Sequence, residues 1–162
     1  PGAAQQIAQN LYAMAGLQAP IVAVFSEGGS GGAEAIGLAD ERIMLSHGYY
    51  SVISPEGCAA ILWRDGTKAP EAATSLKLTS RDHKNNGLID EIITEPIGGA
   101  HRDPATMGKL VAKAISKELD ELVKIPVNEL IEKRYEKIRA MGEFEEATEA
   151  RLAEIVGAEE NS

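Results

Sequence analysis

Residues 25–33 read Phe-Ser-Glu-Gly-Gly-Ser-Gly-Gly-Ala, and this stretch constrains the fold more than any other. An apolar, β-branched run at 21–25 precedes it, and small residues and helix formers at 33–39 follow it. This order predicts a strand, a glycine turn and a buried helix. The glycines leave room for a ligand and expose backbone N–H groups at a helix N-terminus, where the helix dipole favours negative charge. The turn is therefore a candidate site for a phosphate, or for an oxyanion that develops during a reaction.

Composition narrows the class of protein. The chain has 162 residues, 44% of them hydrophobic, and a formal net charge of −9. That charge argues against nucleic acid or an anionic membrane as a partner. The single cysteine, Cys58, excludes a disulfide framework, suits the reducing cytoplasm and is expected to be a small core residue. Scattered histidines and one cysteine give no metal-ligand spacing, and no apolar run is long enough to span a bilayer.

Strand and helix signals alternate along the chain, which predicts an α/β class. Predicted strands lie at 21–25, 41–46, 49–54 and 88–93, and predicted helices at 7–17, 33–39, 58–63, 69–78 and just after Thr79. From Pro104 to Leu122 and after Pro126 two amphipathic helices follow, each with a face dense in opposite charges. They are either a solvated pair packed on the domain edge or a docking surface for another chain. The glutamate-rich segment beyond Gly142 is expected to be a frayed helix or disordered.

The glycine turn does not fit two common phosphate-binding motifs. A P-loop needs lysine where Ala33 stands, and a dinucleotide fingerprint needs glycine where Glu34 stands. Residues 28–32 do match G-x-S-x-G, the nucleophile elbow of serine hydrolases, with Ser30 as the nucleophile. The acid and the histidine of such a triad have four candidates, which are Asp65, Asp90, His83 and His101. A purely structural tight turn is a third interpretation.

Several stretches carry a shared pattern, in the order Glu27–Ala33, Tyr50–Trp63, Lys68–Ala73, Leu88–Ile93, Glu95–Pro104 and Arg134–Lys137. Together they resemble one family, the carboxyltransferase α subunit of bacterial acetyl-CoA carboxylase. The similarity runs over roughly residues 5–142, while Ser26 and Glu34 depart from the family's pattern. The chain begins Pro1-Gly2 without Met, so we expect it to be processed or truncated. Compared with the family, it also lacks the acidic loop that follows Pro-Gly and the N-terminal half.

The resemblance implies a crotonase-like fold, a spiral of ββα units. Residues 1–103 are then the C-terminal portion of a carboxyltransferase domain, 104–142 a helical extension and 143–162 an acidic tail. In this family the α subunit works with a β subunit, expected as an α2β2 heterotetramer. Together they move a carboxyl group from carboxybiotin, borne on a biotin carboxyl carrier protein, to acetyl-CoA, which gives malonyl-CoA for fatty acid synthesis in the cytoplasm.

The resemblance also implies roles for residues of the turn. Backbone N–H groups would stabilise negative charge on the biotin ureido oxygen, and their donors are Gly28, Gly29, Gly31, Gly32 and Ala33. Biotin itself is then the base, a second oxyanion site belongs to the β subunit, and this chain holds no metal. The candidate substrate-binding residues are Ser54, Glu56 and Gly57, although Glu56 also suits a helix start. A serine hydrolase with Ser30 as nucleophile and a non-catalytic scaffold subunit remain the alternatives.

Overall fold

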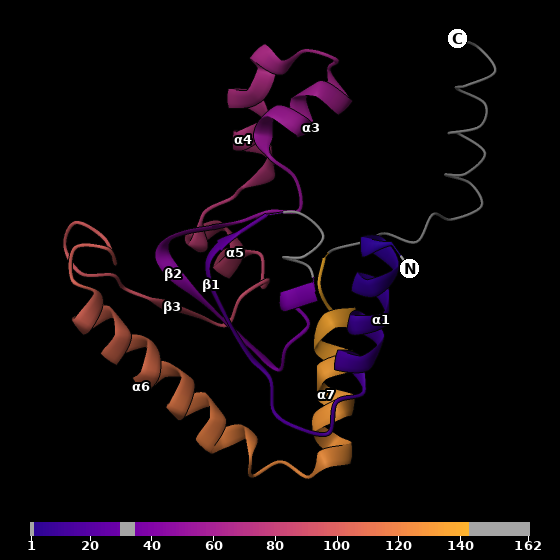
Figure 1. Cartoon of the computed structure of the whole chain (residues 1–162), viewed down its shortest axis with the longest axis vertical. Coiled ribbons are helices and arrows are strands. Elements are labelled where there is room, and N and C mark those ends of the chain that lie inside the picture. The colour runs from indigo at the N-terminus through magenta and orange to yellow at the C-terminus, as the bar shows by residue number, and fades with distance from the viewer. Residues whose placement is uncertain (1, 30–34, 143–162) are drawn as a thin grey trace.

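The fold is that of a small parallel sheet with helices around it (Figure 1). In this computed structural model, residues 2–29 and 35–142 are described, so the turn positions 30–34 and the predicted tail 143–162 lie outside the described residues. The strands are β1 (Val22–Gly28), β2 (Glu41–Tyr50) and β3 (Glu91–Ile93). The helices are α1 (Ala3–Ala15), α3 (Pro55–Leu62), α4 (Ala69–Leu76), α5 (Ser80–Asn85), α6 (Pro104–Leu122), α7 (Val127–Arg139) and the 3-10 helix η1 (Gly66–Lys68).

The sheet is parallel, in the order β1-β2-β3, and buries both faces of its central strand. One cluster of buried side chains gathers Ala23, Phe25, Ala39, Met44 and Ile89. The other gathers Ile43, Leu45 and Ile93 with Met107 and Ala114 of α6. Successive residues of a strand point to opposite faces, so Ile43 and Met44 fall into different clusters. Burial on both faces is typical of parallel sheets and explains the continuous apolar run Ile43–Leu45 within β2.

The strands differ in extent from those predicted. Residues 41–46 and 49–54 are predicted as two strands, but 41–50 form one strand, and residues 51–54 lie outside it. The prediction was wrong because Gly48 resembles a strand break, whereas it sits inside β2 beside an irregular pairing. Phe25 pairs with Met44, but Glu27 pairs with Tyr49, so the register shifts there. Strand β1 continues past Phe25 to Gly28, and β3 is shorter than predicted.

Side-chain caps mark the start of three of the helices. Ser54 Oγ accepts from the N–H of Gly57 at 3.1 Å, and proline occupies the first turn of α3. Thr79 and Asp82 form a capping box that begins α5. Asp103 accepts from the N–H of Thr106 at 3.0 Å and begins α6. These signals depend only on neighbouring residues, which is why the sequence suffices to find them.

Helices α3, η1 and α4 form a projecting unit, residues 55–76, that extends away from the sheet (Figure 1). Its own small core holds Cys58, Ala59 and Ala72, which confirms the buried placement predicted for Cys58. Large apolar side chains nevertheless stay exposed on this unit and its entry, namely Val52, Ile61, Leu62 and Trp63.

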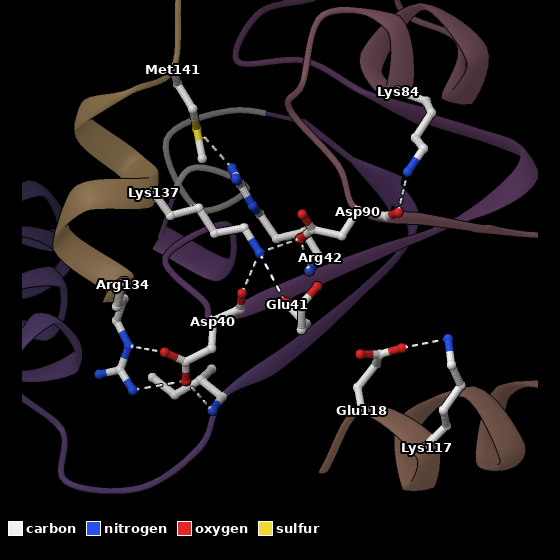
Figure 2. Close-up of polar contacts among 11 residues, drawn as sticks. Asp40, Glu41, Arg42, Lys84, Asp90, Lys117, Glu118, Arg134, Lys137 and Met141 are labelled. Carbon is white, nitrogen blue, oxygen red and sulfur yellow. Dashed lines mark hydrogen bonds and ion pairs between the residues drawn. The ribbon is translucent and has the colours of Figure 1, made fainter. Parts of the chain in front are cut away.

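Arg134 of α7 is the most deeply buried charged residue among those described, at 1% exposure. Its Nε and Nη2 donate to the two carboxylate oxygens of Asp40, each at 2.8 Å (Figure 2). Its Nη groups also donate to four backbone carbonyls, of Met14, Ala15, Leu17 and Ala19. Asp40 in turn accepts from the N–H of Ile21 at 2.7 Å. One side chain therefore joins α7 to the end of α1 and to the start of β1 and β2.

Candidate functional site

The carboxyl ends of the parallel strands meet at one edge of the sheet, and a cavity of about 620 Å³ lies there. Open parallel sheets bind ligands at this edge, because the loops that follow the strands converge on it. The cavity walls come from the ends of β1 and β2 and from the loop after β3: Ser26, Glu27, Leu45, His47, Gly48, Tyr49, Glu95, Gly98, Gly99, Ala100 and His101. The predicted glycine turn leaves β1 at this edge.

Two of the five predicted oxyanion donors are among the described residues. Gly28 pairs with Tyr50, and its carbonyl accepts from the N–H of Ser51 at 2.8 Å. Among the described residues, an added Cβ on Gly29 would meet only the carbonyl oxygen of Ser51, at the ordinary contact distance of 3.9 Å. Gly31, Gly32 and Ala33 lie outside the described residues, as does Ser30.

Gly48 allows strands β1 and β2 to approach closely at the edge of this cavity. A Cβ there would lie 2.7 Å from the carbonyl oxygen of Ser26 and 3.2 Å from that of Phe25. Both atoms belong to the backbone, so they cannot swing away as a side chain does. Glycine in a strand often marks such a close approach. The sequence analysis missed this role, for which a lone glycine between two apolar runs is the only signal.

Glu95 is a second residue that the sequence analysis missed. Its side chain is 7% exposed, and its carboxylate accepts from the N–H groups of His47 and Ala100, each at 2.8 Å. The imidazole of His47 lies 3.5 Å from the same carboxylate. Burial acts to raise the pKa of Glu95, but these hydrogen bonds outweigh it and the pKa is lowered. Glu95 therefore stays ionised and fixes the loop after β3 to the end of β2.

The described residues do not assemble a hydrolase triad. Asp65 accepts from the N–H and hydroxyl of Thr67, which hold the pKa of Asp65 low. Asp90 accepts from the N–H of Arg42 and pairs with a lysine. His83 is buried with Nε2 2.8 Å from the carbonyl oxygen of Tyr50. His101 lines the cavity, and within residues 2–29 and 35–142 no hydrogen bond or ion pair joins either aspartate to either histidine.

The predicted substrate-binding residues lie at the start of α3, on the projecting unit. Ser54 and Gly57 bond to each other as the helix cap, so both serve the local structure. A Cβ on Gly57 would lie 3.1 Å from Cγ1 of Ile53, which keeps this turn tight. Glu56 is exposed in the first helical turn, where a carboxylate favours the dipole. A role in substrate binding stays a prediction for all three.

Neither a metal centre nor a membrane span is evident in the part of the chain that the structure describes. No three His, Cys, Asp or Glu side chains of that part gather in a way that could hold a metal ion. None of its helices has the length and apolar content to cross a bilayer.

Comparison with protein families and curated proteins gives a consistent picture. The family described as "Acetyl co-enzyme A carboxylase carboxyltransferase-like" matches residues 1–142. The chain is 52% identical over 145 residues to the acetyl-coenzyme A carboxylase carboxyl transferase subunit alpha of Xanthomonas axonopodis pv. citri (strain 306). It is 53% identical over 146 residues to the protein of that name from Geobacter metallireducens. These matches cover 89% and 90% of this chain and 46% of each relative, so the chain spans about half the length of the curated relatives it matches.

Solved structures resemble the chain in fold. A Pseudomonas malonate decarboxylase hetero-tetramer in complex with coenzyme A aligns with a TM-score of 0.56 at 15% identity, over 99% of this chain and 59% of that one. A methylmalonyl CoA decarboxylase aligns with a TM-score of 0.52 at 14% identity, over 96% of this chain and 60% of that one. These neighbours have the crotonase fold, so the predicted fold class, an α/β crotonase-like partial domain, is confirmed.

Proposed function

The chain belongs to the acetyl co-enzyme A carboxylase carboxyltransferase-like family, and from this premise we propose that it is part of a carboxyltransferase α subunit. In the proposed reaction a carboxyl group passes from carboxybiotin to the methyl carbon of acetyl-CoA, and malonyl-CoA forms for fatty acid synthesis. The observation that carries the proposal is the 52% identity, over 89% of the chain, to relatives named as that subunit. The serine hydrolase alternative is not favoured, because its acid and histidine candidates are engaged elsewhere or apart.

The glycine turn is the proposed oxyanion site. Bound biotin would supply the ureido group that carries the carboxyl group. After the carboxyl group has left, the same ureido group would accept a proton. The contribution of this chain is to aim backbone N–H groups at the ureido oxygen, from Gly28, Gly29, Gly31, Gly32 and Ala33. Within the described residues only the carbonyl oxygen of Ser51 comes near an added Cβ on Gly29, which suits a ring system that must come close to the backbone. A preorganised donor of this kind can change the rate by on the order of 100- to 1,000-fold.

Glu95 is proposed to position the cavity wall rather than to act as a base. A general base works best with a pKa near the operating pH, whereas hydrogen bonds hold the pKa of Glu95 below its ordinary value. Its bonds to His47 and Ala100 keep the end of β2 and the loop after β3 at a fixed distance. The cavity between them therefore keeps its shape while substrates enter and leave.

The proposed partners are a β subunit, in an α2β2 heterotetramer, and a biotin carboxyl carrier protein. The relatives are named as subunit alpha, which implies a complex of several subunits. Coenzyme A carries several phosphate charges, and this chain has a net charge of −9. Five of its lysines already form ion pairs with glutamates or aspartates: Lys68, Lys117, Lys124, Lys133 and Lys137. We therefore propose that the β subunit supplies most basic contacts to the coenzyme A phosphates.

Substitutions at Gly29 test the oxyanion proposal in the complex with the β subunit and the carrier protein. Gly29→Ala adds a Cβ at ordinary contact distance, so folding is retained, but the new methyl group occupies the proposed approach to the turn. Carboxyl transfer should fall at least tenfold in Gly29→Ala and further in Gly29→Val, with the urea midpoint unchanged. Gly66→Ala is the matched control, since an added Cβ at Gly66 meets none of the described residues within 4 Å, and its activity should equal that of the wild type.

Ser30→Ala separates the remaining alternatives. With backbone donors at work, this variant should keep most of the carboxyl transfer. Labelling of Ser30 by a fluorophosphonate, with hydrolysis lost in Ser30→Ala, would support the nucleophile elbow instead. Full activity in both Gly29 variants would support a subunit that only shapes its partner.

A further inference from the structure

His83 of α5 is a buried imidazole that contacts the end of β2. The residue is 5% exposed, and its Nε2 lies 2.8 Å from the carbonyl oxygen of Tyr50, the last residue of that strand. A carbonyl oxygen only accepts, so Nε2 carries the hydrogen and donates. The other ring nitrogen, Nδ1, is buried and has no hydrogen-bond partner among the described residues. The imidazole therefore directs its hydrogen bond to Tyr50.

Two peptide groups lead from this bond to the glycine turn. The carbonyl of Tyr50 and the N–H of Ser51 belong to one planar peptide group, and that N–H donates to the carbonyl oxygen of Gly28 at 2.8 Å. The carbonyl of Gly28 shares the next peptide group with the N–H of Gly29. Gly29 is exposed at the start of the turn, and its N–H is one of the proposed oxyanion donors. The successive donors are therefore His83, Ser51 and Gly29.

A peptide group transmits polarisation from one end to the other. When its carbonyl accepts a hydrogen bond, electron density moves toward the oxygen, and the N–H of the same group becomes a stronger donor. Chains of such bonds are cooperative, and each bond strengthens the next by roughly 10–30%. The bond from His83 therefore strengthens the donor at Ser51, and the bond from Ser51 strengthens the donor at Gly29.

Helix α5 holds the imidazole in place against β2. Ser80 Oγ donates to the carbonyl oxygen of Ser46 at 2.9 Å, and the N–H of Tyr50 donates to the carbonyl oxygen of Leu78 at 3.3 Å. The rings of His83 and Tyr50 meet edge to face, with their centroids 5.5 Å apart. An imidazole that is held in this way keeps its N–H aimed at one oxygen atom.

We propose that His83 is a positioning residue that strengthens the oxyanion donor at Gly29 through the two intervening peptide groups. This inference rests on the proposed function, because it requires that Gly29 faces the ureido oxygen. A stronger donor stabilises the charge that develops in the transition state more than it stabilises the bound substrate. His83 should therefore affect kcat and leave KM nearly unchanged.

Two substitutions separate the hydrogen-bond donor from the ring. His83→Gln places an amide N–H where Nε2 stands, whereas His83→Leu fills the space without a donor. In the complex with the β subunit and the carrier protein, His83→Leu should lower kcat for carboxyl transfer about two- to fivefold. His83→Gln should restore most of this loss. Ser80→Ala is the matched control with unchanged kcat, because it removes a bond from the same helix to the same strand at Ser46, outside the two peptide groups.

The amide protons of Ser51 and Gly29 give a second readout, measured by NMR on the full chain and independent of activity. An amide proton resonates further upfield when its N–H is less polarised. Both variants of His83 lack the ring, so ring-current shifts cancel when the two are compared. The two amide protons should lie further upfield in His83→Leu than in His83→Gln, with the larger difference at Ser51. Should His83→Leu fail to fold, His83→Asn replaces it, since its shorter amide reaches only the position of Nδ1.

Equal Gly29 resonances in His83→Leu and His83→Gln would overturn the proposal, because the polarisation would then not reach the turn. Equal kcat values in the two variants would overturn it as well, and so would an equal loss of kcat in Ser80→Ala. Loss of carboxyl transfer in Gly29→Ala but not in His83→Leu would refute this role of His83 and leave the proposed function intact. A Gly29 resonance that differs between the variants, in a chain whose Gly29→Ala variant stays fully active, would support the link from His83 and count against the proposed function.

Discussion

Arg134, Asp40 and the backbone carbonyls to which Arg134 donates form a buried clamp. This clamp and the projecting unit at 55–76 are attached to the rest of the molecule in different ways. Arg134 contacts groups as far as 120 residues away in sequence, and every one of its bonds is internal. The projecting unit has its own core of Cys58, Ala59 and Ala72 and carries exposed Ile61 and Leu62. Loss of a clamp contact should therefore unfold the whole chain, whereas loss of a contact in the unit should open that unit alone.

Arg134→Met should give the largest effect, a loss of about 3–5 kcal/mol in the free energy of unfolding. Removing one partner of a buried ion pair leaves the other charge, here Asp40, uncompensated. Urea denaturation followed by circular dichroism measures this loss. Lys133→Met on the same helix, whose pair with Glu129 is exposed, is the control and should leave the midpoint nearly unchanged. Equal losses of unfolding free energy in both variants would mean that the buried pair of Arg134 and Asp40 stabilises the chain no more than an exposed pair does.

Gly48→Ala should cost about 3 kcal/mol, because the new Cβ meets backbone oxygens of β1 that cannot move aside. Urea denaturation is again the measurement. Gly108→Ala in α6 is the control of opposite sign, since its Cβ meets nothing within 4 Å in the part of the chain that the structure describes, and alanine favours helix by up to about 1 kcal/mol. A stable Gly48→Ala variant would show that the two strands can separate without cost.

Glu95→Gln should cost about 2 kcal/mol near neutral pH, since hydrogen bonds to a charged acceptor are lost. The folded-state pKa of Glu95 lies below the ordinary 4.5, so its contribution is present above pH 4.5 and is lost as the pH falls through the depressed pKa. Denaturation of both proteins at a series of pH values measures the difference. The two stability curves should converge in acid, and parallel curves at every pH would contradict this account.

Ser54→Ala should have the smallest effect, about 1 kcal/mol, confined to the projecting unit. Its hydroxyl caps α3, which packs chiefly on η1 and α4. Amide hydrogen exchange should accelerate in α3 and α4 and stay unchanged in β2. Thr79→Ala removes the cap of α5, which packs on β2, so its effect should reach the sheet. Faster exchange in β2 of Ser54→Ala would show that the unit and the sheet unfold together.

The sequence predicts local features well. The two long helices follow from apolar spacing, and the structure confirms them. The caps at Ser54, Thr79 and Asp103 likewise depend only on residues within a few positions of each helix start. The burial of Arg134 does not follow, because an arginine on a helix of mixed charge is ordinarily solvated and its partner lies 94 residues away. Glu95 begins one of the stretches that resemble the family, but its role was not predicted, because its partner His47 lies 48 residues away. The divisions after residues 103 and 142 and the five-residue oxyanion site stay predictions.

The bonds of Arg134 also set an order of events during synthesis. Asp40 leaves the ribosome 94 residues before its counter-ion does. At the usual 5–20 residues per second, the carboxylate and the carbonyls at the end of α1 stay without their partner for roughly 5–20 s. The starts of the first two strands therefore lack this contact until α7 has been synthesised. Because contacts of such long range tend to form late, Arg134→Met should accelerate unfolding far more than it slows refolding.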